Sequence, residues 1–190
     1  FTDRRQRQMC IRDSLFVSFL LEYKIQKFLS NSDTNLLNEA YLLNQSNTPE
    51  VGSLNSVDDL AKLLKMSEDS FVVTFDHLLI GFIVCLREGS AYKSSNYKYF
   101  SQRLDKFLYI DRIAIKTDMR RKGIGEEVYS HIQKTADLNK IPLCCEINTI
   151  PLNRPSIQFH TKLGFEEVGH KSFNDHTVCL LYTSDAADDP

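Results

Sequence analysis

A basic, glycine-containing segment in the second half of the chain has the residue types of an anion-binding turn. It runs from Arg120 to Gly125, reads R-R-K-G-I-G, and directly precedes a helical pattern. Glycine permits a tight turn and close backbone approach to a ligand. The free N–H groups and the dipole of a helix's first turn favour an anion there. The segment therefore predicts a phosphate site. A solvated basic turn fits the same residues, and neither a Walker loop nor a G-x-G-x-x-G motif is present.

A carboxylate, Glu146, is the second group that could do chemistry, in an apolar segment that restarts after Pro142. Successive side chains of a strand point to opposite faces. One predicted face is apolar and the other is polar, with Leu143, Cys145 and Ile147 on the first and Cys144, Glu146 and Asn148 on the second. A charge on an interior strand must line a cleft or be paired, because a lone buried charge is costly. Glu146 is thus a candidate general base, or a structural partner of Arg112 or Arg154.

The hydrophobic periodicity predicts the elements that position these groups. An N-cap at Ser56 begins one helix, and two apolar runs form a hairpin that turns at Asp76-His77, with a bulge at Gly81. Helices are predicted over 15–29, 56–66, 126–138 and 153–163, and strands over 40–43, 71–75, 78–86, 107–115, 143–147, 165–168 and 177–181. Residues 31–38 are a polar linker, and 87–106 have no clear period. This order predicts an α/β fold, a sandwich of helices around a mixed sheet.

The composition is that of one globular domain. The 190 residues include 42% hydrophobic and 25% charged residues, with a formal net charge of -2. The length allows one well-buried core, and the charge provides no basic field for nucleic acid. No apolar run approaches the roughly 20 residues of a membrane-spanning helix. We therefore expect neither nucleic acid nor a membrane as a partner.

The five cysteines are an odd number without the spacing of metal ligands. The neighbours Cys144 and Cys145 point to opposite sides of a strand, which suits neither a zinc site nor a redox pair. Buried cysteines are usually small apolar fillers rather than nucleophiles. The sequence therefore predicts no metal and a reducing, cytoplasmic location.

Two motifs together resemble the GNAT superfamily of acetyltransferases. The segment Arg120–Gly125 matches the family's [Q/R]-x-x-G-x-[G/A] signature, and residues 153–165 match its N-x-x-[A/S]-x-x-x-[Y/H]…G-F ending. The motifs lie in the family's order, and the resemblance covers about residues 38–182. It implies the GNAT fold, with a mixed, mostly antiparallel central sheet flanked by helices.

Within the superfamily the chain is most similar to an uncharacterised group of predicted acetyltransferases. The shared features are D-R after an aromatic residue of a strand, a C-E-[I/V]-N strand, F-H before the last helical turn and a Y-x-S-x-N stretch. In this sequence they are Asp111-Arg112, Cys145–Asn148, Phe159-His160 and Tyr92–Asn96.

The resemblance implies an N-acetyltransferase that uses acetyl-CoA as co-substrate. A neutral primary amine of a small molecule or peptide attacks the thioester directly, and CoA leaves as a thiolate. The backbone of Ile113, Ala114 and Ile115 is then expected to pair with pantetheine. The remaining cofactor contacts implied are Arg120, Arg121, Lys122, Gly123, Ile124, Gly125, Glu126, Asn153 and Ser156.

The resemblance also suggests the proton carriers. Glu146 matches the glutamate that ribosomal-protein N-terminal alanine acetyltransferases use as a base. His160 is the candidate acid, at a position where most relatives carry tyrosine. Histidine can donate a proton near neutral pH, and a packing role is the alternative.

Three further residues are candidates for binding the acceptor: Tyr109, Asp111 and Asn148. Asp111 is expected on the same strand face as Tyr109 and Ile113, where it would bind a cationic amine or assist the base. A structural pair with an arginine is the alternative for Asp111. Residues 87–106 and the first helix would select the acceptor, but their residue types and spacing indicate no particular chemistry.

The predicted organisation has tails around one domain. Residues 7–14 and 180–189 resemble translated sequencing-adaptor read-through, and ordinary terminal tails are the alternative. We expect a non-native tail at 1–14, a helical extension and linker at 15–37, the acetyltransferase domain at 38–182 and a second tail at 183–190. The protein is expected to be a monomer or homodimer. A non-catalytic acyl-CoA sensor is the functional alternative, because it would keep the same phosphate loop.

Overall fold

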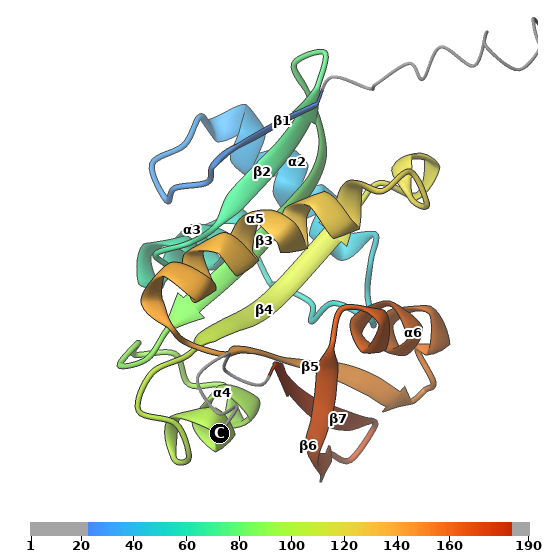
Figure 1. Cartoon of the computed structure of the whole chain (residues 1–190). Helices are drawn as coiled ribbons and strands as arrows, with labels where there is room; N and C mark the ends of the chain where they lie inside the picture. Colours follow the sequence, from blue (N-terminus) through green and yellow to red (C-terminus); the bar gives the residue numbers. More distant parts are fainter. Residues whose placement is uncertain (1–22, 184–190) are drawn as a thin grey trace, which may run out of the picture.

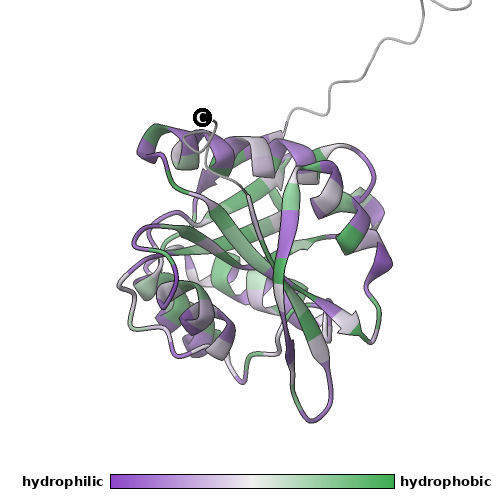
Figure 2. Cartoon of the chain, turned by 60° about the horizontal axis from the view of Figure 1, so that its bottom comes forward, coloured by the Kyte–Doolittle hydropathy of each residue, from purple (hydrophilic) through white to green (hydrophobic). Residues whose placement is uncertain are grey.

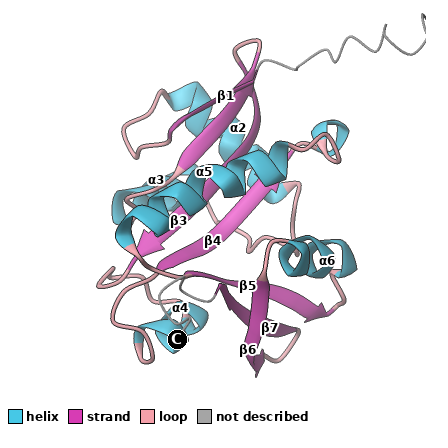
Figure 3. Cartoon of the chain, in the orientation of Figure 1, coloured by secondary structure: helices cyan, strands magenta, loops and turns pink. Residues whose placement is uncertain are grey.

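The computed structural model describes residues 23–183, whose strands form one mixed sheet (Figures 1 and 3). Within that range seven strands lie in the order β1-β2-β3-β4-β5-β7-β6. They are β1 Tyr23–Lys27, β2 Phe71–Phe75, β3 Leu78–Arg87, β4 Leu108–Ile115, β5 Leu143–Ile150, β6 Phe165–Ser172 and β7 Thr177–Thr183. Every neighbouring pair is antiparallel except β4 and β5. The expected mixed, mostly antiparallel sheet is confirmed.

Helices cover both faces of the sheet. The helices are α2 Thr34–Gln45, α3 Val57–Met66, α4 Ser95–Ser101, α5 Ile124–Asn139 and α6 Arg154–Lys162, and a short 3-10 turn, Thr117–Met119, precedes α5. Alternate residues of the strands belong to two hydrophobic clusters, one on each face of the sheet. The helices α2, α3 and α4 pack against the first cluster, and α5 and α6 pack against the second. Figure 2 shows that most of the central strands are hydrophobic and that the helices around them mix hydrophilic and hydrophobic residues.

The strands β4 and β5 separate soon after they begin. They pair only through Leu108 with Leu143 and Tyr109 with Cys144. Beyond Tyr109, the described part of the chain places no strand beside β4 on that side, and β5 turns away to pair with β7 (Figure 1). The result is an opening in the middle of the sheet, beside the start of α5.

A bulge in β4 changes which residues share a face. Val84 pairs with Arg112 and Cys85 pairs with Ile110, so Asp111 is an extra residue. Tyr109 therefore lies in the cluster under α2–α4, whereas Ile113 packs against the cluster under α5 and α6. The prediction that Asp111 shares a face with both residues is wrong, because a bulge interrupts the strand's two-residue period.

Several local predictions are confirmed. Ser56 caps α3, its hydroxyl accepting a hydrogen bond from the backbone N–H of Asp59. The β2–β3 hairpin turns at Asp76 and His77, whose φ values of 49° and 66° fit a two-residue turn of type I′. The bulge predicted at Gly81 lies beside it, where the pairing shifts between Gly81 and Leu79.

The predictions for the first part of the chain are corrected. Residues 23–27 of the helix predicted over 15–29 form β1, paired with β2, and residues 15–22 lie outside the described range. Residues 34–38 of the predicted linker and the strand predicted at 40–43 are instead part of α2, which Asp33 caps through its carboxylate. The polar residues around the buried positions of α2 hid its helical period. In the unpatterned stretch 87–106, α4 begins after a second side-chain cap, Ser94.

The proposed boundaries fall partly outside the described residues. The tail at 1–14 and all of the tail at 183–190 except Thr183, which ends β7, lie outside them. Over residues 23–183, none of the helices combines the length and apolar character needed to span a membrane.

Candidate active site

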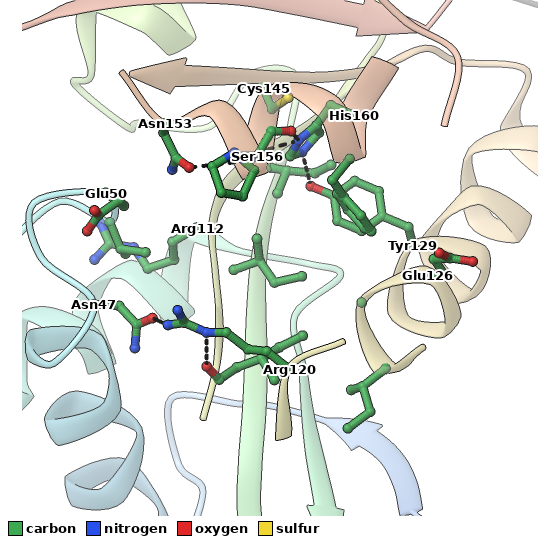
Figure 4. Close-up of a pocket in the computed structure, with 18 of the residues that line it drawn as sticks. Asn47, Glu50, Arg112, Arg120, Glu126, Tyr129, Cys145, Asn153, Ser156 and His160 are labelled. Carbon is green, nitrogen blue, oxygen red and sulfur yellow. Dashed lines mark hydrogen bonds between the residues drawn. The ribbon is translucent and has the colours of Figure 1, made fainter. Parts of the chain in front are cut away.

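A cavity of about 750 Å³ occupies the opening between β4 and β5 (Figure 4). Its walls come from β4, the start of α5, β5, α6 and the loop after α2. Most of the predicted site residues line it: Asp111, Ile113, Ile115, Arg120, Arg121, Gly123, Ile124, Gly125, Glu126, Glu146, Asn153, Ser156 and His160. Ala114, Lys122, Tyr109 and Asn148 are not among the lining residues. The structure thus brings together groups that lie far apart in the sequence.

The start of α5 presents backbone to the cavity. Its N-cap is Gly123, with φ of 81° and no side-chain cap. The first N–H groups of α5 therefore remain available to an anion. Arg121 also adopts a left-handed conformation, with φ of 57°, and its side chain is exposed. This end of the cavity has the features needed to hold the pyrophosphate of a nucleotide.

Gly125 has a different role from Gly123. A Cβ at Gly125 would lie 3.3 Å from the ring of Phe159 on α6. Glycine at this position therefore lets α5 and α6 pack closely beside the opening. Arg120 points away from the helix start, since its guanidinium donates to the carbonyl oxygen of Ile115 and to the side chain of Asn47.

Glu146 lies on β5 at the other end of the cavity and is partly exposed. Its carboxylate accepts a hydrogen bond from the hydroxyl of Tyr109. Burial, and secondarily the charge of Asp111, raise the pKa of Glu146 to about 7, against opposing hydrogen bonds from Tyr109 and Asn96. A carboxyl group with that pKa can exchange a proton near neutral pH.

Asp111 pairs with Arg112 rather than standing alone. Arg112 Nε lies 2.6 Å from Asp111 Oδ2, and both side chains are less than a tenth exposed. The guanidinium also donates to Asn44 Oδ1 at 2.9 Å and to the carbonyl of Gly52 at 3.1 Å. Arg112 is therefore engaged with Asp111 and the loop after α2, and Glu146 is not its ion-pair partner.

Sequence reasoning missed three polar groups of the site. Asn44 holds Arg112, and Asn96 on α4 lies buried with its side-chain oxygen unpartnered within the described structure. Tyr92 is close enough that burial and the Asp111 carboxylate raise its pKa. The Y-x-S-x-N stretch contains two of them, but only the fold places that stretch beside Glu146.

His160 on α6 is only 4% exposed. Its Nδ1 lies 2.8 Å from the carbonyl oxygen of Ser156, and its Nε2 lies 2.5 Å from the hydroxyl of Tyr129 (Figure 4). Burial lowers the pKa of His160, although its hydrogen bond to Ser156 opposes the shift. The imidazole is therefore neutral at pH 7. Tyr129 on α5 is a fourth site residue that sequence reasoning did not select.

The remaining candidates make structural contacts. Asn153 caps α6, where its side chain accepts from the backbone N–H of Ser156 at 3.2 Å. Asn148 donates to the carbonyl of Pro49 at 3.3 Å and so joins β5 to the loop after α2. The described residues contain no cluster of three or more His, Cys, Asp or Glu side chains placed to hold a metal ion.

Comparison with known proteins identifies the class. The model of the acetyltransferase (GNAT) family matches residues 36–165, so the chain belongs to this family. It is accordingly an acetyl-CoA-dependent acyltransferase. No curated protein matches the chain.

Solved structures share the fold at low sequence identity. The ribosomal-protein-S18-alanine N-acetyltransferase from Escherichia coli is 16% identical with a TM-score of 0.63, over 88% of this chain and 98% of that one. Naa50 from Arabidopsis thaliana, in complex with the bisubstrate analogue CoA-Ac-MVNAL, is 19% identical with a TM-score of 0.63, over 85% and 98%. An N-acetyltransferase from Staphylococcus aureus Mu50 is 15% identical with a TM-score of 0.63, over 85% and 97%. These similarities confirm the GNAT fold.

Proposed function

We propose that this protein transfers an acetyl group from acetyl-CoA to a primary amine of a small molecule or peptide, with Glu146 as the general base. The observation that carries the proposal is the carboxyl group of Glu146, with a pKa of about 7, in the same cavity as the open start of α5. The amine must lose a proton to become a nucleophile, and a base with this pKa can accept it near neutral pH.

The residues at the cofactor end fit acetyl-CoA. The uncapped N-terminus of α5 suits the pyrophosphate. After Tyr109, β4 no longer pairs with β5, so its edge toward the opening suits an extended amide-bearing chain. Such a ligand would deliver its thioester toward Glu146, and holding two reactants together in this way can itself supply much of the rate.

The acceptor end of the cavity favours a cation. Glu50, Asp111 and Glu146 line it, and the nearby Arg112 is paired with Asp111. Excess carboxylate attracts an ammonium group before it is deprotonated. The Arabidopsis neighbour was solved with a peptide-containing bisubstrate analogue, and we extend an acceptor of this kind, alongside small amines, to this chain.

The direct test is incubation with acetyl-CoA and a panel of amines, measured as released CoA thiol. The panel contains small primary amines and peptides with free N-termini, and N-acetylated versions of the same compounds serve as controls. We expect thiol release with at least one free amine and none with its blocked form. Release with no amine, from protein that CoA at 100 times its Kd stabilises by about 2.7 kcal/mol, would contradict the proposal and favour a sensor.

A further inference from the structure

A tyrosine–histidine pair lies at the boundary between α5, α6 and the cavity. Tyr129 is on α5, a little over one turn after the open helix start, and His160 is near the end of α6. Their side chains meet through the Tyr129 hydroxyl and His160 Nε2 at 2.5 Å, and both residues line the cavity (Figure 4). The pair therefore shares the cavity with the start of α5 and with Glu146.

The hydrogen bonds of His160 determine which member of the pair has a proton to give. The carbonyl oxygen of Ser156 can only accept, so the neighbouring Nδ1 carries the hydrogen of the neutral imidazole. Nε2 is then an acceptor, and the hydroxyl of Tyr129 donates to it. The proton of the pair that is not donated to the backbone therefore belongs to Tyr129, and it lies in the hydrogen bond to Nε2.

Packing fixes the position of the Tyr129 ring. The rings of Phe159, His160 and Phe165 meet it edge-to-face, with centroids 5.2, 5.2 and 6.0 Å away. Only 3% of Tyr129 is exposed. Burial raises the pKa of its phenol well above the usual value, so the group stays protonated at neutral pH. To donate toward the cavity, the hydroxyl would exchange its hydrogen bond to Nε2 for one to the ligand, while the packed ring keeps its position.

The pair and the candidate base lie on opposite sides of the opening. Tyr129 belongs to the cluster under α5 and α6, which also contains Cys145. Glu146, the next residue of β5, is held from the other side by Tyr109, whose ring belongs to the cluster under α2–α4. A thioester between β4 and β5 would therefore have a proton acceptor on one side and a proton donor on the other.

We propose that Tyr129 is the catalytic acid that protonates the departing thiolate, with His160 as the residue that positions its hydroxyl. This inference rests on the proposed acetyl transfer. The amine nitrogen forms a bond to the acetyl carbon, the carbon–sulfur bond breaks, and its electron pair leaves with sulfur. The Tyr129 proton then passes to sulfur and yields the CoA thiol. The proton that the nitrogen still loses on becoming an amide returns to the phenolate through water, and the ammonium proton taken earlier by Glu146 goes to solvent.

The test is a mutant cycle on the two residues, with kcat, KM and melting temperature measured for each variant. Tyr129→Phe removes only the hydroxyl, and we expect kcat to fall on the order of a hundredfold with little change in KM for acetyl-CoA. His160→Phe keeps the phenol of Tyr129 but removes the acceptor of its hydrogen bond, so kcat should fall less than in Tyr129→Phe. The solvent deuterium isotope effect on kcat should persist in His160→Phe and diminish in Tyr129→Phe.

The double variant separates chemistry from packing. Tyr129→Phe alone leaves Nε2 of His160 buried without a partner, so its melting temperature should fall. Replacing both residues by phenylalanine removes the orphaned group, so stability should recover while kcat stays as low as in Tyr129→Phe. The matched control is Tyr97→Phe, since Tyr97 is equally buried, donates to the Arg87 carbonyl at 2.7 Å and does not line the cavity. It should keep the wild-type kcat.

Two results would overturn this inference and leave the proposed acetyl transfer intact. The first is a lower kcat for His160→Phe than for Tyr129→Phe, in a protein whose wild type is active. That result would make His160 the acid. The other is a double variant that regains kcat together with stability, which would show a structural role. A wild type that binds CoA but acetylates no amine would instead overturn the proposed function, and this inference with it.

Discussion

The two ends of the cavity are constructed differently. At the cofactor end, most candidate contacts come from one continuous stretch, Ile113–Glu126, and the groups proposed to hold an anion are backbone N–H groups at Gly123 and after it. At the acceptor end, the polar groups are buried side chains from α2, α4, β4 and β5 that bond to one another. The first end can lose a side chain with little harm to the fold. In the second, function and stability depend on the same contacts, because partly satisfied buried networks are costly.

The largest expected effect is at the acceptor end, where Arg112→Met should cost about 3–5 kcal/mol of unfolding free energy. The substitution leaves the carboxylate of Asp111 buried without its partner. Denaturant unfolding measures the loss. The double variant Asp111→Leu/Arg112→Met should recover much of it, because an apolar pair can replace a buried ion pair at little cost. A loss below about 1 kcal/mol in the single variant would mean that the network does not support the fold.

A smaller and opposite effect is expected at the cofactor end. Arg121→Gly should stabilise the protein by up to about 1 kcal/mol, because glycine adopts the left-handed conformation at φ of 57° without the steric strain that a side chain adds. The lost charge should weaken CoA binding by up to about fivefold. The matched control is His77→Gly, at φ of 66° in the β2–β3 turn, because His77 does not line the cavity. It should gain similar stability and leave the Kd for CoA unchanged, as calorimetry can show. Equal effects of both variants on CoA binding would remove Arg121 from the site.

The same contrast explains what the sequence could predict. The turn that precedes α5 was predictable because its glycines lie in consecutive local sequence, and Ser56 and the β2–β3 hairpin were predictable because caps and turns are local. Glu146 was found from strand alternation, and the structure places it in the cavity.

What could not be predicted depends on contacts between distant segments. The bulge at Asp111 is visible only in the pairing of β4 with β3. Asn44 contacts Arg112 across 68 residues, and Tyr129 meets His160 across 31. No local spacing carries that information. The apolar pattern over residues 15–29 fits a helix, but residues 23–27 within it pair with β2 and form a strand instead.

The central claim is that Glu146 accepts the proton of the amine, and the pH dependence of kcat tests it most directly. Since the pKa of Glu146 is raised to about 7, the wild-type kcat should rise with pH through that value as the carboxylate forms. Glu146→Gln keeps the hydrogen bond from Tyr109 but cannot accept a proton. We expect its kcat to be lower by on the order of a hundredfold at neutral pH, to show no rise near pH 7, and its CoA affinity to be nearly unchanged. A variant whose kcat rises with pH as the wild type's does would contradict the account.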